Sequence, residues 1–179
     1  AKAALVCGEN PQKSYAYLST GNFNEKTAEL YSDMSLMTSE CSLTAEIKNL
    51  FFVFETKNRD VQFNHLLVAQ FNMNETLIHM IHREAEIAKQ GKKAQIILKM
   101  NGMQDPVMIN ELYKASEAGV QIDLIIRGIC CIIPNQSFSK NIHITRIVDQ
   151  RLEHSRVWYF YNNGEENLYL TSADWMKRN

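Results

Sequence analysis

The sequence has no large excess of either positive or negative charge, and it has no long apolar runs. Its 179 residues include 19 lysines and arginines against 20 aspartates and glutamates, for a formal net charge of −1. A surface this close to neutral offers polyanions no general attraction, so a phosphate site requires a local cluster of cations. No apolar run is long enough to span a bilayer as a helix. The hydrophobic share of 45% is enough to bury a real core.

Cysteine is scarce and poorly spaced for metal binding. The four cysteines are Cys7, Cys41, Cys130 and Cys131. The adjacent pair fits no common zinc pattern, so we expect reduced thiols in a reducing compartment. His79 and His82 lie three residues apart on one predicted helix, but no third ligand accompanies them. We therefore expect a solvated helix flank there and no metal site in the chain.

From residue 65 onward, segments typical of strands alternate with segments typical of helices. The predicted strands are Leu66–Ala69, Ala94–Lys99, Gln121–Ile126 and Ile142–Val148, and the predicted helices are Glu75–Lys89 and Pro106–Ala118. Asn74 is the expected cap of the first helix, and Val107 is expected on the inward face of the second. The alternation predicts an α/β fold with a parallel-rich sheet and helices on its faces. Ligands of such sheets bind beyond the carboxyl ends of the strands.

The part of the chain before residue 55 follows a different pattern. Two short strands form a hairpin, a further strand is predicted at Tyr31–Met37, and a helix follows with Glu46 on its outer side. Residues 55–64 are charged and lack periodicity, which is typical of a linker or a mobile loop. We therefore predict two domains, residues 1–54 and residues 65–179.

A hairpin in the last quarter of the chain resembles the hairpin at its start. Segment 169–174 aligns with segment 17–22, and a turn of slightly different length brings Lys2 onto Arg156. His154 then falls on the position just before the first residue, where we predict a histidine in the parent chain. The alternative is two unrelated hairpins that look alike by chance.

His154 and Arg156 are the sharpest candidates for chemistry. Strand side chains alternate with period two, so these residues are predicted to face the same way. An imidazole beside a fixed positive charge suits a phosphoryl group. We assign catalytic roles to both, and to Lys2 through the repeat; the alternative is a structural histidine. Glu153 either orients His154 or lies on a solvated strand face.

Further candidates lie at the ends of neighbouring strands. Arg127 ends one strand and is followed by Gly128. A guanidinium group binds phosphate through two hydrogen bonds, and glycine lets a ligand approach the backbone. Lys99 and Asn101 lie at the end of the neighbouring predicted strand, Ala94–Lys99. Together with Asn22 they form the predicted phosphate-binding set. The alternatives are a surface arginine beside a turn and a solvated lysine.

Tyr31 begins a predicted strand near the first hairpin. Its ring can stack on a nucleotide base, and its hydroxyl can donate to a phosphate. The alternative is a half-buried tyrosine of a sheet. The residues alone favour the half-buried tyrosine and leave the nucleotide contact open.

Several motifs together resemble polyphosphate kinases of the long bacterial type. They follow one another through nearly the whole chain: Thr20–Ala28 with Leu30–Tyr31, Lys99–Asn101, Arg127–Cys131, Ile147–Asp149, Leu152–Arg156 and Ser172–Asn179. The resemblance implies a phospholipase D-like mixed sheet flanked by helices, with paired His-x-Lys units. It implies one nearly complete domain, truncated at its C-terminus and preceded by the C-terminal part of a similar domain.

The resemblance also implies an activity, the reversible transfer of the ATP γ-phosphate to inorganic polyphosphate through a phosphohistidine. Tyr31, Arg127 and His154 match the family's ATP-binding positions. The phosphorylated histidine falls just before Ala1, so we expect the isolated chain to be inactive. The Mg²⁺ ligands are expected outside this chain. The expected partners are ATP, ADP and polyphosphate, with no nucleic acid, in a cytoplasmic homo-oligomeric parent that associates peripherally with membranes.

Two other functions are open at this point. A phosphodiesterase of the phospholipase D or nuclease type would use the same paired histidine units without ATP. A non-catalytic module would use the chain as a phosphate-binding half-site in an assembly. Labelling of a histidine in the parent by ATP and magnesium separates the first alternative from the kinase, and a polyphosphate-binding assay addresses the second.

Overall fold

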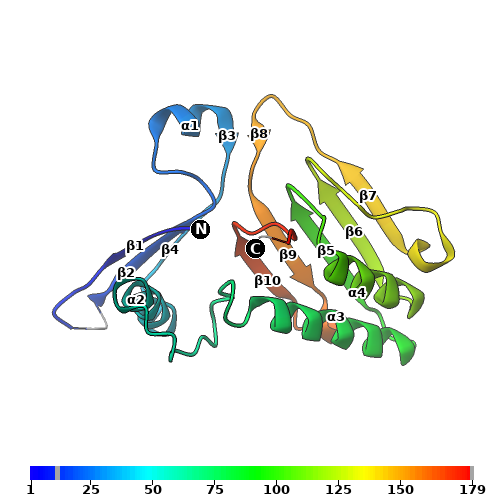
Figure 1. The fold of residues 1–179 in the computed structure, drawn as a ribbon, viewed down its shortest axis with the longest axis horizontal. Coiled ribbons are helices and arrows are strands. Elements are labelled where there is room, and N and C mark those ends of the chain that lie inside the picture. Colours follow the sequence, from blue (N-terminus) through cyan, green and yellow to red (C-terminus); the bar gives the residue numbers. More distant parts are fainter. Residues whose placement is uncertain (11–12, 178–179) are drawn as a thin grey trace.

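A computed structural model describes residues 1–10 and 13–177, so the last two residues of the Ser172–Asn179 motif lie outside the described residues. Two sheets are joined by a short two-stranded pairing (Figure 1). The strands are β1 (Lys2–Val6), β2 (Tyr15–Ser19), β3 (Tyr31–Ser32), β4 (Ser35–Thr38), β5 (Gln95–Met100), β6 (Gln121–Ile126), β7 (Ile142–Arg146), β8 (Leu152–Glu153), β9 (Arg156–Phe160) and β10 (Asn167–Thr171). The helices are α1 (Glu25–Leu30), α2 (Cys41–Thr56), α3 (Met73–Lys89) and α4 (Pro106–Glu117).

The larger sheet is mixed and has the strand order β10-β9-β5-β6-β7. β5, β6 and β7 run parallel, whereas β9 pairs antiparallel with both β5 and β10. Every second residue of the central strands is buried: Ile96, Leu98, Met100, Ile122, Leu124, Ile126, Trp158 and Phe160. This period of two marks one face of the sheet as the core.

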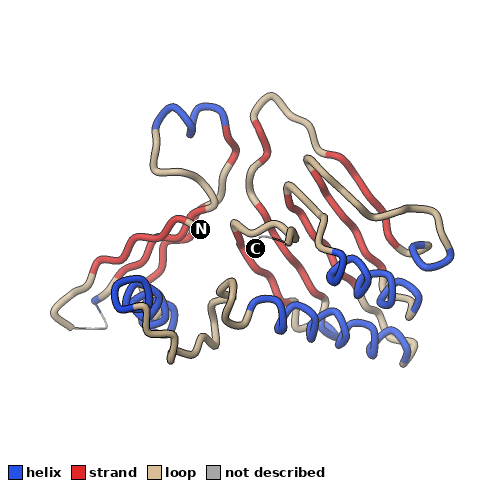
Figure 2. Tube along the Cα trace, viewed as in Figure 1, coloured by secondary structure: helices blue, strands red, loops and turns tan. Residues whose placement is uncertain are grey.

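Helices α3 and α4 pack on that buried face (Figures 1 and 2). Leu77 and Ile81 of α3 and Leu112 of α4 are at most 1% exposed and belong to the same core cluster as the strand residues. The predicted apolar stripes therefore do face the sheet. The connection from β6 to β7 contains only a short 3₁₀ turn at Ser137–Ser139, so it contributes no α-helix to the opposite face.

The smaller sheet has the order β1-β2-β4, and α2 packs against β1 and β2. The strand predicted at Tyr31–Met37 is interrupted by Asp33, whose Oδ1 accepts a hydrogen bond from Thr20 Oγ1 at 2.8 Å. Gly21 makes room for this carboxylate, because a Cβ at Gly21 would lie 2.7 Å from Asp33 Oδ2. The interruption separates β3 from β4 and lets β3 leave the sheet.

The chain has two units: the first holds β1–β4, α1 and α2, and the second holds α3, α4 and β5–β10. β3 pairs in parallel with β8 and so joins these two units. Tyr31 lies opposite Leu152, and Ser32 lies opposite Glu153. The backbone N–H of His154 donates to the Ser32 carbonyl at 3.0 Å. Figure 1 shows β3 and β8 side by side between the two sheets. Residues far apart in the sequence therefore meet beside His154.

The two hairpins have matching registers, as the repeat predicts. Lys2 pairs with Ser19 in the β1–β2 hairpin, and Arg156 pairs with Thr171 in the β9–β10 hairpin. The sequence alignment equates Ser19 with Thr171. Lys2 and Arg156 therefore occupy the same register position in the two hairpins.

The strand predicted at Leu66–Ala69 was wrong. These residues form a bend and the start of a turn before α3. Asn72 stabilises it, because its Oδ1 accepts from Val68 N at 2.8 Å and its Nδ2 donates to the Leu66 carbonyl at 3.0 Å. An asparagine side chain can form hydrogen bonds with the backbone groups of a tight turn, which in a strand would bond to a neighbouring strand.

The helix ends also differ from the predictions. α3 begins at Met73 after Asn72, so Asn74 lies inside the helix and does not cap it. Val107 is 56% exposed in the first turn of α4, so it does not face inward. Asp105 caps this helix, with Oδ1 accepting from Val107 N at 2.9 Å.

Glu46 is buried, contrary to the prediction that it lies on the outer side of α2; the residue is 6% exposed. Its carboxylate accepts hydrogen bonds from the backbone N–H groups of Asn64 at 2.7 Å, His65 at 3.0 Å and Leu66 at 2.8 Å. Hydrogen bonds to an ionised acceptor are stronger than those between neutral groups. One carboxylate thus holds the segment between the units against α2.

The Glu46→Gln substitution keeps the shape of this side chain but turns one acceptor into a donor that faces backbone N–H groups. We expect the free energy of unfolding to fall by about 1–3 kcal/mol, as measured by urea denaturation. Glu55→Gln, at an exposed position of the same helix, is the control and should change it by less than about 0.5 kcal/mol. Equal effects of the two substitutions would contradict the assigned role of Glu46.

Candidate functional site

A polar pocket of about 330 Å³ lies at the carboxyl ends of β5 and β6, which we call the strand-end pocket. This is the edge of a parallel sheet at which ligands bind. Its lining residues are Tyr31, Asn101, Gly102, Arg127, Gly128, Ile129, His154, Arg156, Asp174 and Met176. Tyr31 comes from the first unit, and the other residues come from the second. The pocket therefore lies across the boundary between the units.

His154 lines the strand-end pocket just before β9 begins. Its Nδ1 lies 2.7 Å from Asp33 Oδ1, and the two side chains are 17% and 18% exposed. An ionised carboxylate can only accept, so the contact requires a proton on Nδ1. Nε2 of the neutral ring is then left as an acceptor, and it becomes a donor when the ring is protonated. Asp33 thus sets the tautomer of His154.

Tyr31 packs against the same histidine. The ring centroids of Tyr31 and His154 lie 4.9 Å apart, with an angle of 64° between the planes. Such edge-to-face contacts stabilise aromatic pairs. Tyr31 is half-buried at the start of β3, as its structural alternative predicts, and it also lines the pocket. One face of His154 is therefore fixed by an aromatic ring.

Arg127 directly follows β6 and contributes a cation to the strand-end pocket. Its Nη1 is buried and has no hydrogen-bond partner among the described residues. A buried donor without a partner is costly, so such a group points to a missing acceptor. Gly128 has a structural reason to be glycine, because a Cβ there would lie 2.8 Å from the Asn101 carbonyl oxygen.

Arg156 has its donors occupied by the protein. Its Nε and Nη2 donate to Asp174 Oδ1 and Oδ2, each at 3.1 Å, and its Nη1 donates to the His154 carbonyl at 2.8 Å. With its amide oxygen turned toward these donors, Asn101 accepts from Arg156 Nη2 at 2.5 Å. The residue is only 8% exposed. Arg156 and His154 both line the strand-end pocket, although His154 lies before β9 and not on it, and Arg156 is an internally paired cation.

Lys99 lies outside the lining of the strand-end pocket. Its Nζ donates to Glu153 Oε2 at 2.8 Å and to Ser155 Oγ at 2.6 Å. Glu153 was a candidate for orienting His154, but its carboxylate binds Lys99. Of the predicted phosphate-binding set, only Asn101 lies in the pocket, since Asn22 is exposed at the end of the first hairpin.

Lys2 is half-buried at the start of β1. The amino group of Ala1 donates to Ser172 Oγ, so the ends of the two hairpins meet. The start of the first hairpin therefore lies against the end of the second.

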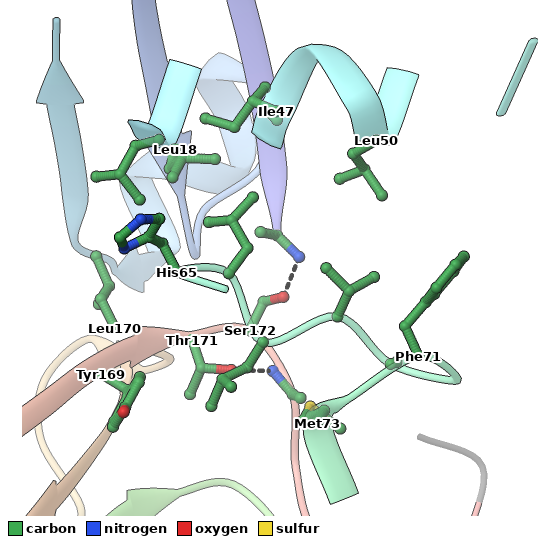
Figure 3. A pocket seen from close by; sticks show the side chains of 18 of the residues that line it. Leu18, Ile47, Leu50, His65, Phe71, Met73, Tyr169, Leu170, Thr171 and Ser172 are labelled. Atoms are coloured by element: carbon green, nitrogen blue, oxygen red, sulfur yellow. Dashed lines mark hydrogen bonds between the residues drawn. The ribbon is translucent and has the colours of Figure 1, made fainter. Parts of the chain in front are cut away.

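A larger cavity of about 830 Å³ lies on the other side of this hairpin contact (Figure 3). Most of its lining residues are apolar, and Leu18 of β2, Leu50 of α2, Phe71 of the turn before α3 and Leu170 of β10 are among them. His65 also lines the cavity. Its walls are mainly apolar, although Lys57 and Arg59 also line them. Arg127, His154 and Arg156 line the strand-end pocket, and this is the cluster considered for phosphate chemistry.

Asp33 was missed as a site residue from the sequence. It stands within a stretch that was read as one strand, although aspartate is uncommon inside strands. That mismatch was the available signal for a special role. Its contact with His154 depends on the β3–β8 pairing, which no local pattern reveals.

The described residues do not fit a magnesium site. No group of three or more His, Cys, Asp or Glu side chains among them could hold a metal ion. The two carboxylates beside the pocket already bind His154 and Arg156. Magnesium requires several oxygen ligands, so no step is assigned here to an ion held by this chain. No helix in the described part is long and apolar enough to cross a membrane.

Two family models match the chain in succession. Residues 1–60 match "Polyphosphate kinase C-terminal domain 1", and residues 66–179 match "Polyphosphate kinase C-terminal domain 2". Among solved structures, a polyphosphate kinase from Porphyromonas gingivalis superposes with a TM-score of 0.91 at 48% identity, covering 98% of this chain and 27% of that one. These matches confirm the predicted fold class, a phospholipase D-like domain preceded by part of a similar one.

Curated relatives agree with these matches. The polyphosphate kinase of Synechocystis is 46% identical over 177 residues, which cover 98% of this chain and 24% of that protein. The polyphosphate kinase of Escherichia coli K12 is 45% identical over 166 residues, which cover 92% of this chain and 24% of that protein. The chain thus spans about a quarter of the length of these relatives.

The Asp33→Asn substitution tests the contact that sets the tautomer of His154. An asparagine oxygen still accepts a hydrogen bond, but it lacks the charge that makes the Nδ1–H form the only good match. We expect ¹⁵N NMR of the neutral imidazole to report mainly Nδ1–H in the unmodified chain and a larger Nε2–H share in the variant. His154→Gln assigns the resonance. An unchanged tautomer ratio would contradict the contact.

Proposed function

The chain belongs to the polyphosphate kinase family, and from this we propose that its parent protein reversibly transfers the γ-phosphate of ATP to inorganic polyphosphate through a phosphohistidine. The chain would supply part of the site that binds ATP and stabilises the transferring phosphoryl group. ATP, ADP and polyphosphate are the proposed substrates and products.

One observation carries the proposal. Tyr31, Arg127 and His154, which the family resemblance assigns to ATP binding, lie far apart in the sequence but line one pocket. The pocket contains a buried guanidinium nitrogen for which the described residues offer no hydrogen-bond partner, and an oriented imidazole. A phosphate oxygen is the acceptor that suits such a guanidinium group.

The proposed nucleophile is a histidine at the position before Ala1. The repeat makes this position equivalent to His154, and the contact between Ala1 and Ser172 brings it to the second hairpin. Its imidazole would attack the γ-phosphorus in line, with ADP leaving on the opposite side. Polyphosphate would then take the phosphoryl group from the histidine.

His154 would act on the leaving oxygen of ADP. Because Asp33 holds a proton on Nδ1, Nε2 is the nitrogen available to the substrate. A protonated Nε2 donates a hydrogen bond or a proton to the leaving group, and a neutral one takes the proton back in the reverse reaction. Both directions break and form similar phosphoanhydrides, so the transfer is close to thermoneutral.

Arg127 and Lys2 would bind the phosphoryl oxygens. Catalysis of phosphoryl transfer comes almost entirely from positioning and charge stabilisation, which these cations would provide. Arg156 was predicted to hold the neighbouring phosphates, but its donors bind Asp174 and the His154 carbonyl. We therefore propose that Arg156 supports His154 and does not bind phosphate.

The His154→Ala substitution in the full-length parent tests the proposed role of the imidazole. We expect ATP-to-polyphosphate turnover to fall on the order of 10²–10³-fold, as is typical for the loss of a general acid. Turnover within about twofold of the unmodified enzyme would contradict the role.

Labelling of the parent with γ-³²P ATP separates a kinase from a phosphodiesterase, because only the kinase acquires an acid-labile phosphohistidine.

The Arg127→Gln substitution tests the unpaired guanidinium group. We expect kcat/KM for ATP in the full-length parent to fall on the order of 10²–10³-fold, because one charged contact to the transferring phosphate is lost. Arg146→Gln is the matched control, since Arg146 is an exposed arginine at the end of the adjacent strand β7. An equal, small effect of both substitutions would remove Arg127 from the proposed site.

A further inference from the structure

The two hairpins differ in charge at one equivalent position. Segment 17–22 ends in Asn22, and the aligned segment 169–174 ends in Asp174. Asn22 is exposed, whereas Asp174 is only 7% exposed and lines the strand-end pocket. A buried carboxylate beside a site for phosphates is unfavourable unless its charge is matched, so its presence needs a reason.

The contacts of Asp174 supply that reason. Its Oδ1 accepts from the backbone N–H groups of Asn101 at 2.8 Å and Gly102 at 3.1 Å, and from Arg156 Nε at 3.1 Å. Its Oδ2 accepts from Arg156 Nη2 at 3.1 Å. The carboxylate is therefore both neutralised by a guanidinium group and hydrogen-bonded to the loop that follows β5.

These bonds connect two parts of the lining of the strand-end pocket, the loop after β5 and the segment before β9. The Asn101 carbonyl accepts from Gly128 N at 2.9 Å, next to Arg127. On the other side, Arg156 Nη1 donates to the His154 carbonyl at 2.8 Å. Asp174 is the group that both connections share. Its carboxylate thus controls the spacing between the Arg127 backbone and the His154 backbone.

We infer that Asp174 is a positioning residue of the nucleotide site, which acts through Arg156 and the loop after β5 and not by touching substrate. The Asp174–Arg156 pair contributes little net charge to the pocket, so Arg127 is the arginine of the described pocket lining that offers positive charge to phosphate. The first hairpin has no carboxylate at this position, so Lys2 keeps its full charge. Testing this inference by enzyme activity rests on the proposed function, because the test measures turnover of ATP.

The Asp174→Asn substitution tests this inference and introduces the residue found in the first hairpin. The amide oxygen can still accept from the loop, but the amide NH₂ group faces the donors of Arg156, and a buried arginine charge loses its partner. Small displacements of reacting groups are costly, so kcat/KM for ATP in the full-length enzyme is expected to fall on the order of a hundredfold. KM for ATP should rise as kcat falls.

Asp105→Asn is the matched control, since Asp105 caps α4 outside the pocket and asparagine is also a good cap. This control should retain its kcat/KM, and the unfolding midpoint of Asp174→Asn should stay close to that of the control. Unchanged kinetics in Asp174→Asn would overturn the inference. A loss of activity that only follows a lowered unfolding midpoint would also overturn it.

A double variant covers the case in which Asp174→Asn folds poorly. Asp174→Asn with Arg156→Gln removes the unmatched buried charge, and residues that act through one another give losses that do not add. The double variant should therefore be no less active than the worse of the two single variants. Losses that multiply would show that Asp174 acts independently of Arg156 and would overturn the inference.

A measurement without turnover separates this inference from the proposed function. If the unmodified full-length protein does not form polyphosphate from ATP, the proposed function fails, and amide hydrogen exchange then tests the inference. In Asp174→Asn the amides of Asn101 and Gly102 should exchange faster than in the unmodified protein, because they lose an ionised acceptor. Unchanged exchange at both amides would overturn the positioning role.

Discussion

The hydrogen bond between Asp33 Oδ1 and His154 Nδ1, 2.7 Å long, joins the two units of the chain where the pocket forms. It depends on the parallel pairing of β3 with β8, which sets residues 31–32 beside residues 152–153. It also depends on Gly21, which leaves space for the Asp33 carboxylate. The imidazole therefore has a defined tautomer and a fixed ring plane only when both units are docked. A site built this way links the arrangement of the domains to the chemistry that we propose.

The internal repeat explains why the site lies at this boundary. The two hairpins share a register, and they meet end to end through Ala1 and Ser172. The cations at the equivalent positions of the two hairpins, however, have different partners. Arg156 is paired with the buried Asp174, whereas the described part of the chain shows no carboxylate paired with Lys2. Near-symmetric scaffolds with unequal charges suit a reaction in which one side receives a phosphoryl group and the other stabilises the leaving group.

Local patterns in the sequence predicted much of the fold. The β-branched runs at Gln95–Met100 and Gln121–Ile126 and the apolar stripe of α3 are strands and a helix, because short-range periodicity controls them. Predictions failed where a single polar side chain satisfied distant backbone groups. Glu46 binds the chain eighteen or more residues away, and Asn72 forms a turn in place of the predicted strand at Leu66–Ala69. Such contacts depend on tertiary structure and leave no periodic signal.

The predictions for the candidate site succeeded and failed for the same physical reasons. Arg127 could be identified from its residue type and its position at a strand end, His154 from its spacing to Arg156 and from the repeat, and Tyr31 from the family resemblance. Asp33 and the pairing of Arg156 could not, because each depends on which elements lie side by side. The central claim is that nucleotide binds across both units. Hydrogen–deuterium exchange of the full-length protein with a non-hydrolysable ATP analogue tests it: the account predicts protection at residues 31–33 together with residues 126–129 and 152–156. Protection confined to one unit, or absent from all three segments, would contradict it.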